Sequence, residues 1–281
     1  MNAPVPISGL AEIADRYTLL LVDQFGTLHD GRTPYAQAAD ALARYRASGG
    51  KVVVLSNSAK PGTANIERLQ GFGFDDHHFD AVVTSGDAAQ AAMRAGELGD
   101  AFRPGGKIHL SGQPGADYGF GAFGFVSATP DEAAGIILAA SQEPDRNWRQ
   151  QIRDLSDAAK RGVSIAVCNP DLEMLTSKGV RPSAGAIAIE LARLGARLHT
   201  FGKPHPHIYR AALAVAGNPP AVQVLAIGDS PEHDLLGAAQ LGIDGALVRT
   251  GIMAGVSADD LAQRLPAKSG NPWFSLPELR W

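Results

Sequence analysis

The sequence has little cysteine and no long apolar run, and both shortages exclude classes of protein. Cys168 is the only cysteine in 281 residues, so no disulfide can form within the chain, which fits a reducing, cytoplasmic compartment. No stretch reaches the roughly 18 consecutive apolar residues of a membrane span. The first residues lack the charged and apolar segments of a signal peptide. We therefore expect a cytoplasmic protein with no membrane partner.

Charged and aromatic residues are also sparse. Charged side chains make up 19% of the chain, aromatic ones 6%, and the net charge is -4. This balance offers no basic face for nucleic acid, and a hydrophobic content of 45% is enough for a packed core. The length suits one large domain or two modest ones. Small acidic or neutral metabolites remain as candidate ligands.

The C-terminal segment is apolar for the end of a chain. Pro272, Trp273, Phe274 and Trp281 predict docking of this segment onto the core or onto a partner. A homo-oligomer therefore remains open.

Short apolar runs alternate with helical patterns along most of the chain. This alternation is typical of βαβ units and predicts an α/β fold with a parallel sheet. The expected strands are 17–22, 51–55, 81–84, 108–110, 163–167, 197–200, 222–227 and 245–248. The expected helices are 34–48, 63–70, 87–95, 148–159, 184–194, 206–216 and 233–241, the first with Thr33 as its N-cap and Pro34 at its first position. Residues 103–124, rich in glycine and aromatic residues, indicate a second domain.

The segment Gly119 to Gly124 spells the G-x-G-x-x-G of dinucleotide-binding turns. Such a turn needs a strand directly before it and a helix opening at its end. Residues 112–118 are polar and turn-like, and residues 125–127 have an extended pattern. The context favours a plain glycine-rich loop over a nucleotide site.

Polar side chains follow four of the expected strands. Asp23 ends the first strand, Ser56 and Asn57 end the second, Lys203 follows the strand at 197–200, and Asp229 ends the strand at 222–227. The carboxyl ends of parallel strands meet at one edge of a sheet, so these side chains should converge although they span some two hundred residues.

Together these residue types form a phosphoryl-transfer site. Asp23 can act as the nucleophile, and Asp229 with Asp23 can hold a hard divalent cation such as Mg²⁺. Lys203 can neutralise charge on the transferring group, and Ser56 with nearby backbone N–H groups can hold phosphate oxygens. Asp234 follows closely and adds a third carboxylate.

The chain at this point resembles the haloacid dehalogenase (HAD) superfamily. The resemblance rests on Asp23-Gln24-Phe25-Gly26-Thr27, Leu55-Ser56-Asn57, Gly202-Lys203-Pro204 and Gly228-Asp229-Ser230-Pro231-Glu232-His233-Asp234. The long insertion between Ser56 and Lys203 is similar to that of class II-A, the branch of nitrophenylphosphatase-like enzymes. The resemblance implies a Rossmann-like three-layer α/β/α core, residues 1–86 and 200–281, with an inserted α/β cap, residues 87–199.

The resemblance also implies roles for single residues. Asp23, Lys203 and Ser56 would be catalytic, and Ser56, Asn57, Gly26 and Lys203 would bind substrate. Mg²⁺ would be held by Asp23, the backbone carbonyl of Phe25, Asp229 and Asp234.

In the inserted segment, Asn169-Pro170-Asp171 resembles the part of the cap that faces the core in this branch. Asn169 and Asp171 are therefore candidate substrate contacts. A simple turn built from Asn-Pro-Asp is the equally supported alternative.

Phe25 is a departure from the family pattern. Phosphatases of the superfamily usually carry a second aspartate there, which protonates the leaving group and then activates water. Phenylalanine can do neither, and general acid–base catalysis is worth roughly 10²–10⁴ in rate. His29 and Asp30 are candidate replacement acids, as is a cap residue, against the simpler interpretation of a turn with a solvent-facing polar pair.

Three functions remain. The preferred one is a Mg²⁺-dependent, phosphatase-like hydrolase acting through Asp23 on a small phosphorylated metabolite, with either a stable leaving group or one of these substitute acids. The second is carbon–halogen hydrolysis, because dehalogenases of the superfamily also have an aromatic residue before Gly-Thr-Leu and halide departure needs no proton. The third is a non-catalytic protein that binds a phosphometabolite.

Overall fold

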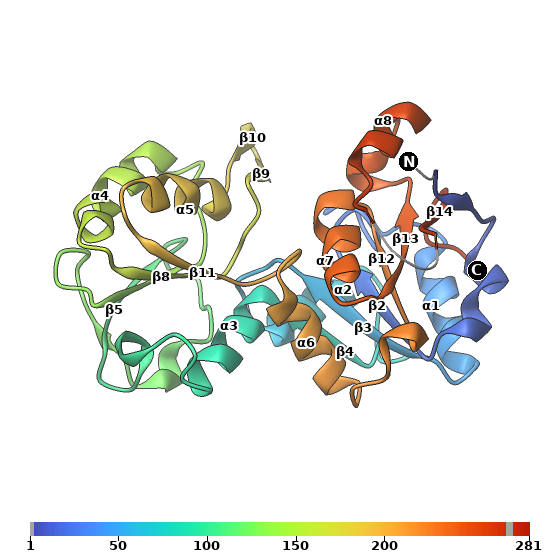
Figure 1. Cartoon of the computed structure of the whole chain (residues 1–281), viewed down its shortest axis with the longest axis horizontal. Helices are drawn as coiled ribbons and strands as arrows, with labels where there is room; N and C mark the ends of the chain where they lie inside the picture. The colour runs from blue at the N-terminus through green and yellow to red at the C-terminus, as the bar shows by residue number, and fades with distance from the viewer. Residues whose placement is uncertain (1–2, 268–271) are drawn as a thin grey trace. The chain divides into compact units, whose positions relative to one another are not determined.

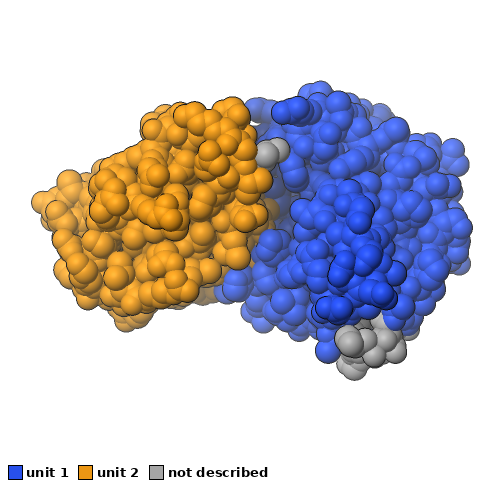
Figure 2. Space-filling view, turned by 90° about the horizontal axis from the view of Figure 1, so that it is seen from above, with its two compact units in different colours: residues 1–56, 62–83, 203–281 blue, residues 57–61, 84–202 orange. Residues whose placement is uncertain are grey.

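The computed structural model describes residues 3–267 and 272–281, and the chain divides into two compact units (Figure 2). Unit 1 contains residues 1–56, 62–83 and 203–281, and unit 2 contains residues 57–61 and 84–202. The sequence analysis predicted domain boundaries after residues 86 and 199, whereas the units divide after residues 83 and 202. It also assigned residues 57–61 to the core domain, whereas they belong to unit 2. In the part of the chain that the structure describes, no helix is long and apolar enough to cross a membrane.

Unit 1 is built on a seven-stranded sheet with the order β1-β14-β13-β12-β2-β3-β4 (Figure 1). The strands are β1 Val5–Pro6, β2 Leu19–Asp23, β3 Lys51–Ser56, β4 Ala81–Thr84, β12 Val224–Gly228, β13 Asp244–Val248 and β14 Phe274–Leu276. The pairs from β1 through β3 in this order are parallel. All residues of β2, β12 and β13 are buried, as expected for central strands of a parallel sheet covered on both faces.

Helices cover unit 1 on both faces of its sheet. They are α1 Ala38–Ala47, α2 Gly62–Gln70, α6 Pro206–Val215, α7 Leu236–Gln240 and α8 Ala258–Arg264. Leu20 and Val22 of β2 pack in one core cluster with Leu42 of α1. Successive strand residues point to opposite faces, so Leu19 and Leu21 are buried on the other side.

Unit 2 has its own five-stranded parallel sheet, in the order β11-β8-β7-β5-β6, and a separate hairpin of β9 and β10. The strands are β5 Lys107–Ser111, β6 Val126–Ser127, β7 Gly135–Leu138, β8 Ser164–Val167, β9 Glu173–Thr176, β10 Gly179–Pro182 and β11 Arg197–Thr200, and the helices are α3 Ser85–Arg94, α4 Trp148–Lys160 and α5 Ala184–Arg193. Leu138, Leu155 and Ile187 pack in its core. The predicted α/β class with parallel sheets is confirmed.

Some elements differ from the sequence prediction. The first helix begins at Ala38 and not at Pro34, because Pro34 pairs with His29 in an isolated β-bridge and the Tyr35 N–H donates to the Leu28 carbonyl. Strand β7 was missed. The predicted helix at 233–241 is divided into a π-helical turn, Pro231–Leu235, followed by α7.

Two other segments agree with the sequence. The G-x-G-x-x-G segment holds only a short 3-10 turn, Gly121–Phe123, followed by β6, so the loop interpretation is confirmed. The C-terminal segment docks onto the core, where β14 pairs with β13 and β1.

Candidate active site

The register of the unit 1 sheet brings the predicted site residues to one edge. Asp23 is the last residue of β2 and lies opposite Leu55 of β3, so Ser56 is one residue further on. On the other side of β2, Val22 lies opposite Ile227 of β12, and Asp229 follows that strand directly. Strand pairing therefore places Asp23, at the end of β2, next to Asp229, which follows β12.

Lys203 links two of the carboxylates. It lies three residues before α6 and is 3% exposed. Its Nζ donates hydrogen bonds to Asp23 Oδ1 and to Asp234 Oδ1, the latter at 2.8 Å. Burial alone would favour the neutral amine, but the charges of Asp23 and Asp234 outweigh it and raise the pKa of Lys203. The lysine is therefore held as a cation between the two acids.

Three buried carboxylates surround this single lysine. Asp23, Asp229 and Asp234 each offer an oxygen, and these oxygens lie within 4.8 Å of one another. Burial raises the pKa of Asp23 well above its usual range, against the opposing charge of Lys203. Burial and the nearby Asp234 raise the pKa of Asp229 to about 7. One lysine does not compensate three buried carboxyl groups, so two of them hold protons more tightly than usual.

This donor set fits a hard divalent cation. Clustered carboxylate oxygens are the ligands that Mg²⁺ and Ca²⁺ prefer. A divalent cation would also balance the charge that Lys203 leaves uncompensated. Among the described residues, a second candidate group, Asp75 to His77, is exposed and offers no such burial.

Two glycines allow the backbone to approach Asp229. Gly26 and Gly251 both have positive φ, +88° and +53°, and a Cβ at either position would collide with Asp229 Oδ2. The same oxygen accepts a hydrogen bond from the Ile252 N–H at 2.8 Å. The Gly26 N–H itself donates within the loop to the His29 carbonyl at 2.8 Å. Phosphate binding by Gly26 remains a prediction.

The sequence analysis missed several residues that fix the acids in place. The Ser230 N–H donates to Asp234 Oδ2 at 3.0 Å, and the Tyr209 hydroxyl donates to the backbone carbonyls of His233 and Asp234. The Thr250 hydroxyl donates to the Gly26 carbonyl at 2.6 Å. The one available signal was Thr250-Gly251, which follows a strand at the same edge of the sheet.

The loop after Asp23 replaces the expected second acid with an aromatic side chain. Phe25 is 47% exposed, and its ring lies against Gly31 and the edge of His29. Asp30 is exposed and accepts hydrogen bonds from the N–H groups of Arg32 and Thr33, which lower its pKa. The predicted turn is therefore correct for Asp30.

His29 does not face solvent, which corrects the sequence interpretation. It is 1% exposed, and its ring stacks on Phe72 at 4.4 Å between centroids. Its Nδ1 accepts the Gly31 N–H at 3.0 Å, while Nε2 is buried without a hydrogen-bond partner among the described residues. Burial, reinforced by the charge of Arg68, lowers the pKa of His29 to about 4. His29 is therefore neutral at neutral pH.

The state of His29 predicts acid sensitivity. Unfolded histidine has a pKa near 6.5, so stability is complete above that pH and falls as pH drops toward 4, by about 1.4 kcal/mol per pH unit. Asp229, whose pKa is raised to about 7, gains stability as pH falls over the same interval, so we expect the loss as a difference between the native chain and a His29 variant in urea unfolding between pH 6.5 and 4.5. The variant His29→Gln, which keeps an acceptor for the Gly31 N–H, should lose less over the same interval. Equal slopes for the two proteins would contradict the assignment.

The predicted substrate contacts of unit 2 form a connected group. Asn57 Nδ2 donates to Asp171 Oδ1 at 2.8 Å, and the Asp171 N–H donates to Asn169 Oδ1 at 2.9 Å. The second bond is typical of an Asx turn. Contact of these side chains with substrate remains a prediction.

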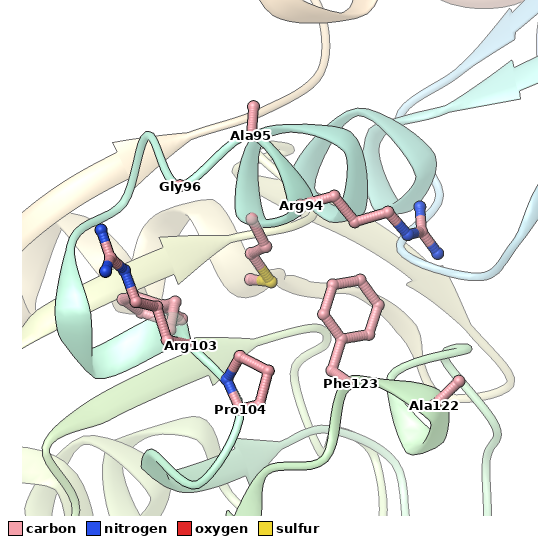
Figure 3. A pocket seen from close by; sticks show the side chains of 9 residues that line it. Arg94, Ala95, Gly96, Arg103, Pro104, Ala122 and Phe123 are labelled. Carbon is pink, nitrogen blue, oxygen red and sulfur yellow. The ribbon is translucent and has the colours of Figure 1, made fainter.

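Unit 2 also contains a cavity of about 560 Å³, shown in Figure 3. The Arg94 guanidinium at its wall lies over the Phe123 ring, 4.8 Å from the centroid, and donates to Gln90. The lining residues are Met93, Arg94, Ala95, Gly96, Phe102, Arg103, Pro104, Ala122 and Phe123. None of them was predicted as a catalytic or metal-binding residue.

Two models of known families match the chain. A haloacid dehalogenase-like hydrolase model covers residues 20–125, and a HAD-hydrolase-like model covers residues 200–270. The first segment contains Asp23 and Ser56, and the second contains Lys203, Asp229 and Asp234. The matched segments therefore include the whole buried cluster.

Known proteins show the same likeness. D-glycerol 3-phosphate phosphatase from Mycobacterium tuberculosis is 27% identical over 86% of this chain and 66% of its own length, so the chain spans just under two thirds of that relative. A haloacid dehalogenase-like hydrolase from Brucella suis has a TM-score of 0.79 and 28% identity, covering 97% of this chain and 99% of that one. The p-nitrophenyl phosphatase from Archaeoglobus fulgidus shares the fold, with a TM-score of 0.73 and 22% identity over 93% and 96% of the two chains.

The chain therefore belongs to the haloacid dehalogenase-like hydrolases, as the motifs at Asp23 and Asp229 predicted. The D-glycerol 3-phosphate phosphatase and the Brucella suis hydrolase support the class II branch and a phosphatase-like hydrolase, and the p-nitrophenyl phosphatase shares the fold.

Proposed function

We propose that the protein is a Mg²⁺-dependent phosphatase that uses Asp23 as its nucleophile on a small phosphorylated metabolite. One observation carries the proposal. Asp23, at the carboxyl end of a central strand, is bonded to buried Lys203 and clustered with Asp229 and Asp234. A nucleophile, a fixed cation and a metal-binding acid pair are the parts that phosphoryl transfer requires.

The reaction proceeds in two displacements at phosphorus. In the first, an Oδ atom of Asp23 attacks, an aspartyl phosphate forms, and the leaving group departs with the electron pair. In the second, water attacks the same phosphorus, its proton passes to solvent, and Asp23 is regenerated as phosphate leaves. Lys203 orients Asp23 and neutralises part of the phosphoryl charge. Ser56 and Asn57 are the proposed phosphate contacts.

The metal would be held by Asp23, Asp229 and the backbone carbonyl of Phe25, with Asp234 alongside. When bound, Mg²⁺ supplies charge neutralisation for the phosphoryl oxygens. Asp234 already accepts hydrogen bonds from Lys203 and from the Ser230 N–H on its two oxygens. Its main role is therefore to hold Lys203, and Asp229 is the stronger ligand candidate.

The relatives support the substrate class. The names of the two phosphatases compared above refer to an alkyl phosphate and an aryl phosphate, both small phosphomonoesters. We assign unit 2 the role of a cap, with Asn169 and Asp171 as its substrate contacts.

The proposal predicts metal-dependent phosphate release. Purified protein should release phosphate from p-nitrophenyl phosphate with Mg²⁺ and stop when the metal is removed with a chelator. The variant Asp229→Asn should need a much higher Mg²⁺ concentration, because one carboxylate ligand is lost. Halide release from a 2-haloacid without metal would favour the dehalogenase alternative. Ligand binding without any turnover would favour the non-catalytic one.

A further inference from the structure

We propose that this site is restricted to phosphoryl compounds whose leaving group departs without receiving a proton. Such leaving groups are carboxylates, phosphates and phenolates, as in acyl phosphates, diphosphates and aryl phosphates. Alkyl phosphates of sugars or glycerol, which release a basic alkoxide, are poor substrates. The inference rests on the proposed function and names the substrate class of the same site.

The first observation is the way Phe25 is held. Its ring fills the space over Gly31, where a Cβ would come within 2.7 Å of the ring, and it meets the edge of His29 at 5.8 Å between centroids. Gly31 has a φ of +93°, a conformation that suits glycine. Position 25 is therefore a half-exposed aromatic side chain in contact with Gly31 and His29, two residues after the nucleophile, with no proton to give.

The second observation concerns the other titratable side chains of the same loop. Residues 24–33 contain three: His29, Asp30 and Arg32. The Nδ1 of His29 accepts the Gly31 N–H, and its ring is buried against Phe72. Asp30 binds the N–H groups of Arg32 and Thr33 at 2.8 and 2.7 Å. Arginine stays protonated in proteins. The loop therefore offers no acid to the leaving group.

Lys203 is not a proton source either. Its Nζ already donates to Asp23 and Asp234, and all three side chains are buried. Both bonds hold the ammonium group against the carboxylates, away from the role of a free proton donor.

The chemical consequence follows from the first displacement. The bond between phosphorus and the leaving oxygen breaks, and the electron pair stays on that oxygen. A carboxylate, phosphate or phenolate is stable as the resulting anion, whereas an alkoxide needs a proton as it leaves. General acid help is worth roughly 10²–10⁴ in rate, so its loss should separate the two classes by a similar factor.

A graded series of leaving groups tests the inference. We would measure kcat/KM with Mg²⁺ for aryl phosphates whose phenols differ in pKa, and for one alkyl phosphate. The parent protein should show a steep fall as the leaving group becomes more basic, with the alkyl phosphate about 10²–10⁴ below the best aryl phosphate. We use kcat/KM because it reports the first displacement even if breakdown of the aspartyl phosphate limits kcat.

Two variants at position 25 provide the matched comparison. Phe25→Asp introduces a carboxyl group and should raise kcat/KM for the alkyl phosphate and flatten the series. Phe25→Asn has nearly the same size and polarity but no ionisable proton, so its series should stay steep. Urea unfolding of both variants would establish that they are folded.

The outcomes separate the inference from the proposed function. A flat series for the parent protein would overturn the inference, because a proton must then come from elsewhere, while the phosphatase proposal would stand. A steep series in Phe25→Asp would overturn the assignment to position 25. Absence of phosphate release from every compound, with parent and variants folded, would contradict the proposed function and the inference with it.

Discussion

Asp23→Asn is expected to abolish phosphate release, with kcat falling about 10⁴-fold or more, as in other enzymes that lose their nucleophile. The amide is nearly the same size as the carboxylate but cannot form the aspartyl phosphate. Parent protein quenched in acid during turnover should carry one phosphate, located on Asp23 by mass spectrometry and released by hydroxylamine. The variant should carry none.

The fold should tolerate this change. Asp23→Asn removes one of three clustered negative charges and leaves Lys203 bonded to Asp234. Asp40→Asn, an exposed acid paired with Arg44 on α1, is the matched control and should keep parental turnover. Substantial phosphate release by a folded Asp23→Asn protein would exclude Asp23 as the nucleophile.

Lys203→Met should produce the largest loss of stability. The substitution keeps an unbranched chain of similar length but leaves Asp23, Asp229 and Asp234 buried without their cation. Removal of one partner from a buried ion pair costs about 3–5 kcal/mol. We expect that loss in urea unfolding at pH 8, together with loss of turnover.

The loss in Lys203→Met should depend on pH and metal. A carboxyl whose pKa is raised in the folded state is less unfavourable when protonated, so lowering the pH from 8 to 6 should recover part of the stability. Mg²⁺ should recover part as well. Lys160→Met, in an exposed pair with Asp157, should cost less than about 1 kcal/mol. A Lys203→Met protein as stable as the parent at pH 8 would show that the carboxylates do not need the lysine.

The sequence predicted the strands that carry the site, because apolar runs ending in a polar residue mark central parallel strands. The convergence of Asp23 and Asp229 follows from this architecture alone. The sequence could not predict the hydrogen-bond partners of these residues. The bond from Lys203 to Asp23, for example, joins residues 180 positions apart in the chain. Rotamers and loop packing decide such contacts.

The burial of His29 is a second feature that the sequence could not predict. Its neighbours Asp30 and Gly31 indicated an exposed turn, which is correct for Asp30. The burial of His29 depends on Phe72, which stacks on it from beyond α2. Local pattern cannot foresee a contact made by a distant aromatic ring. The same reason explains the late start of α1, where Pro34 pairs with His29 before the helix begins.

The approach of Gly26 and Gly251 to Asp229 has an evolutionary consequence. Neither glycine contributes a reactive group, yet a single added methyl at either position would push against the acid between them. Each of the two loops is therefore restricted to glycine at this point as long as Asp229 keeps its position. Shape therefore limits substitution around Asp229 as strictly as chemistry does, whereas the half-exposed position 25 has room for side chains of other kinds.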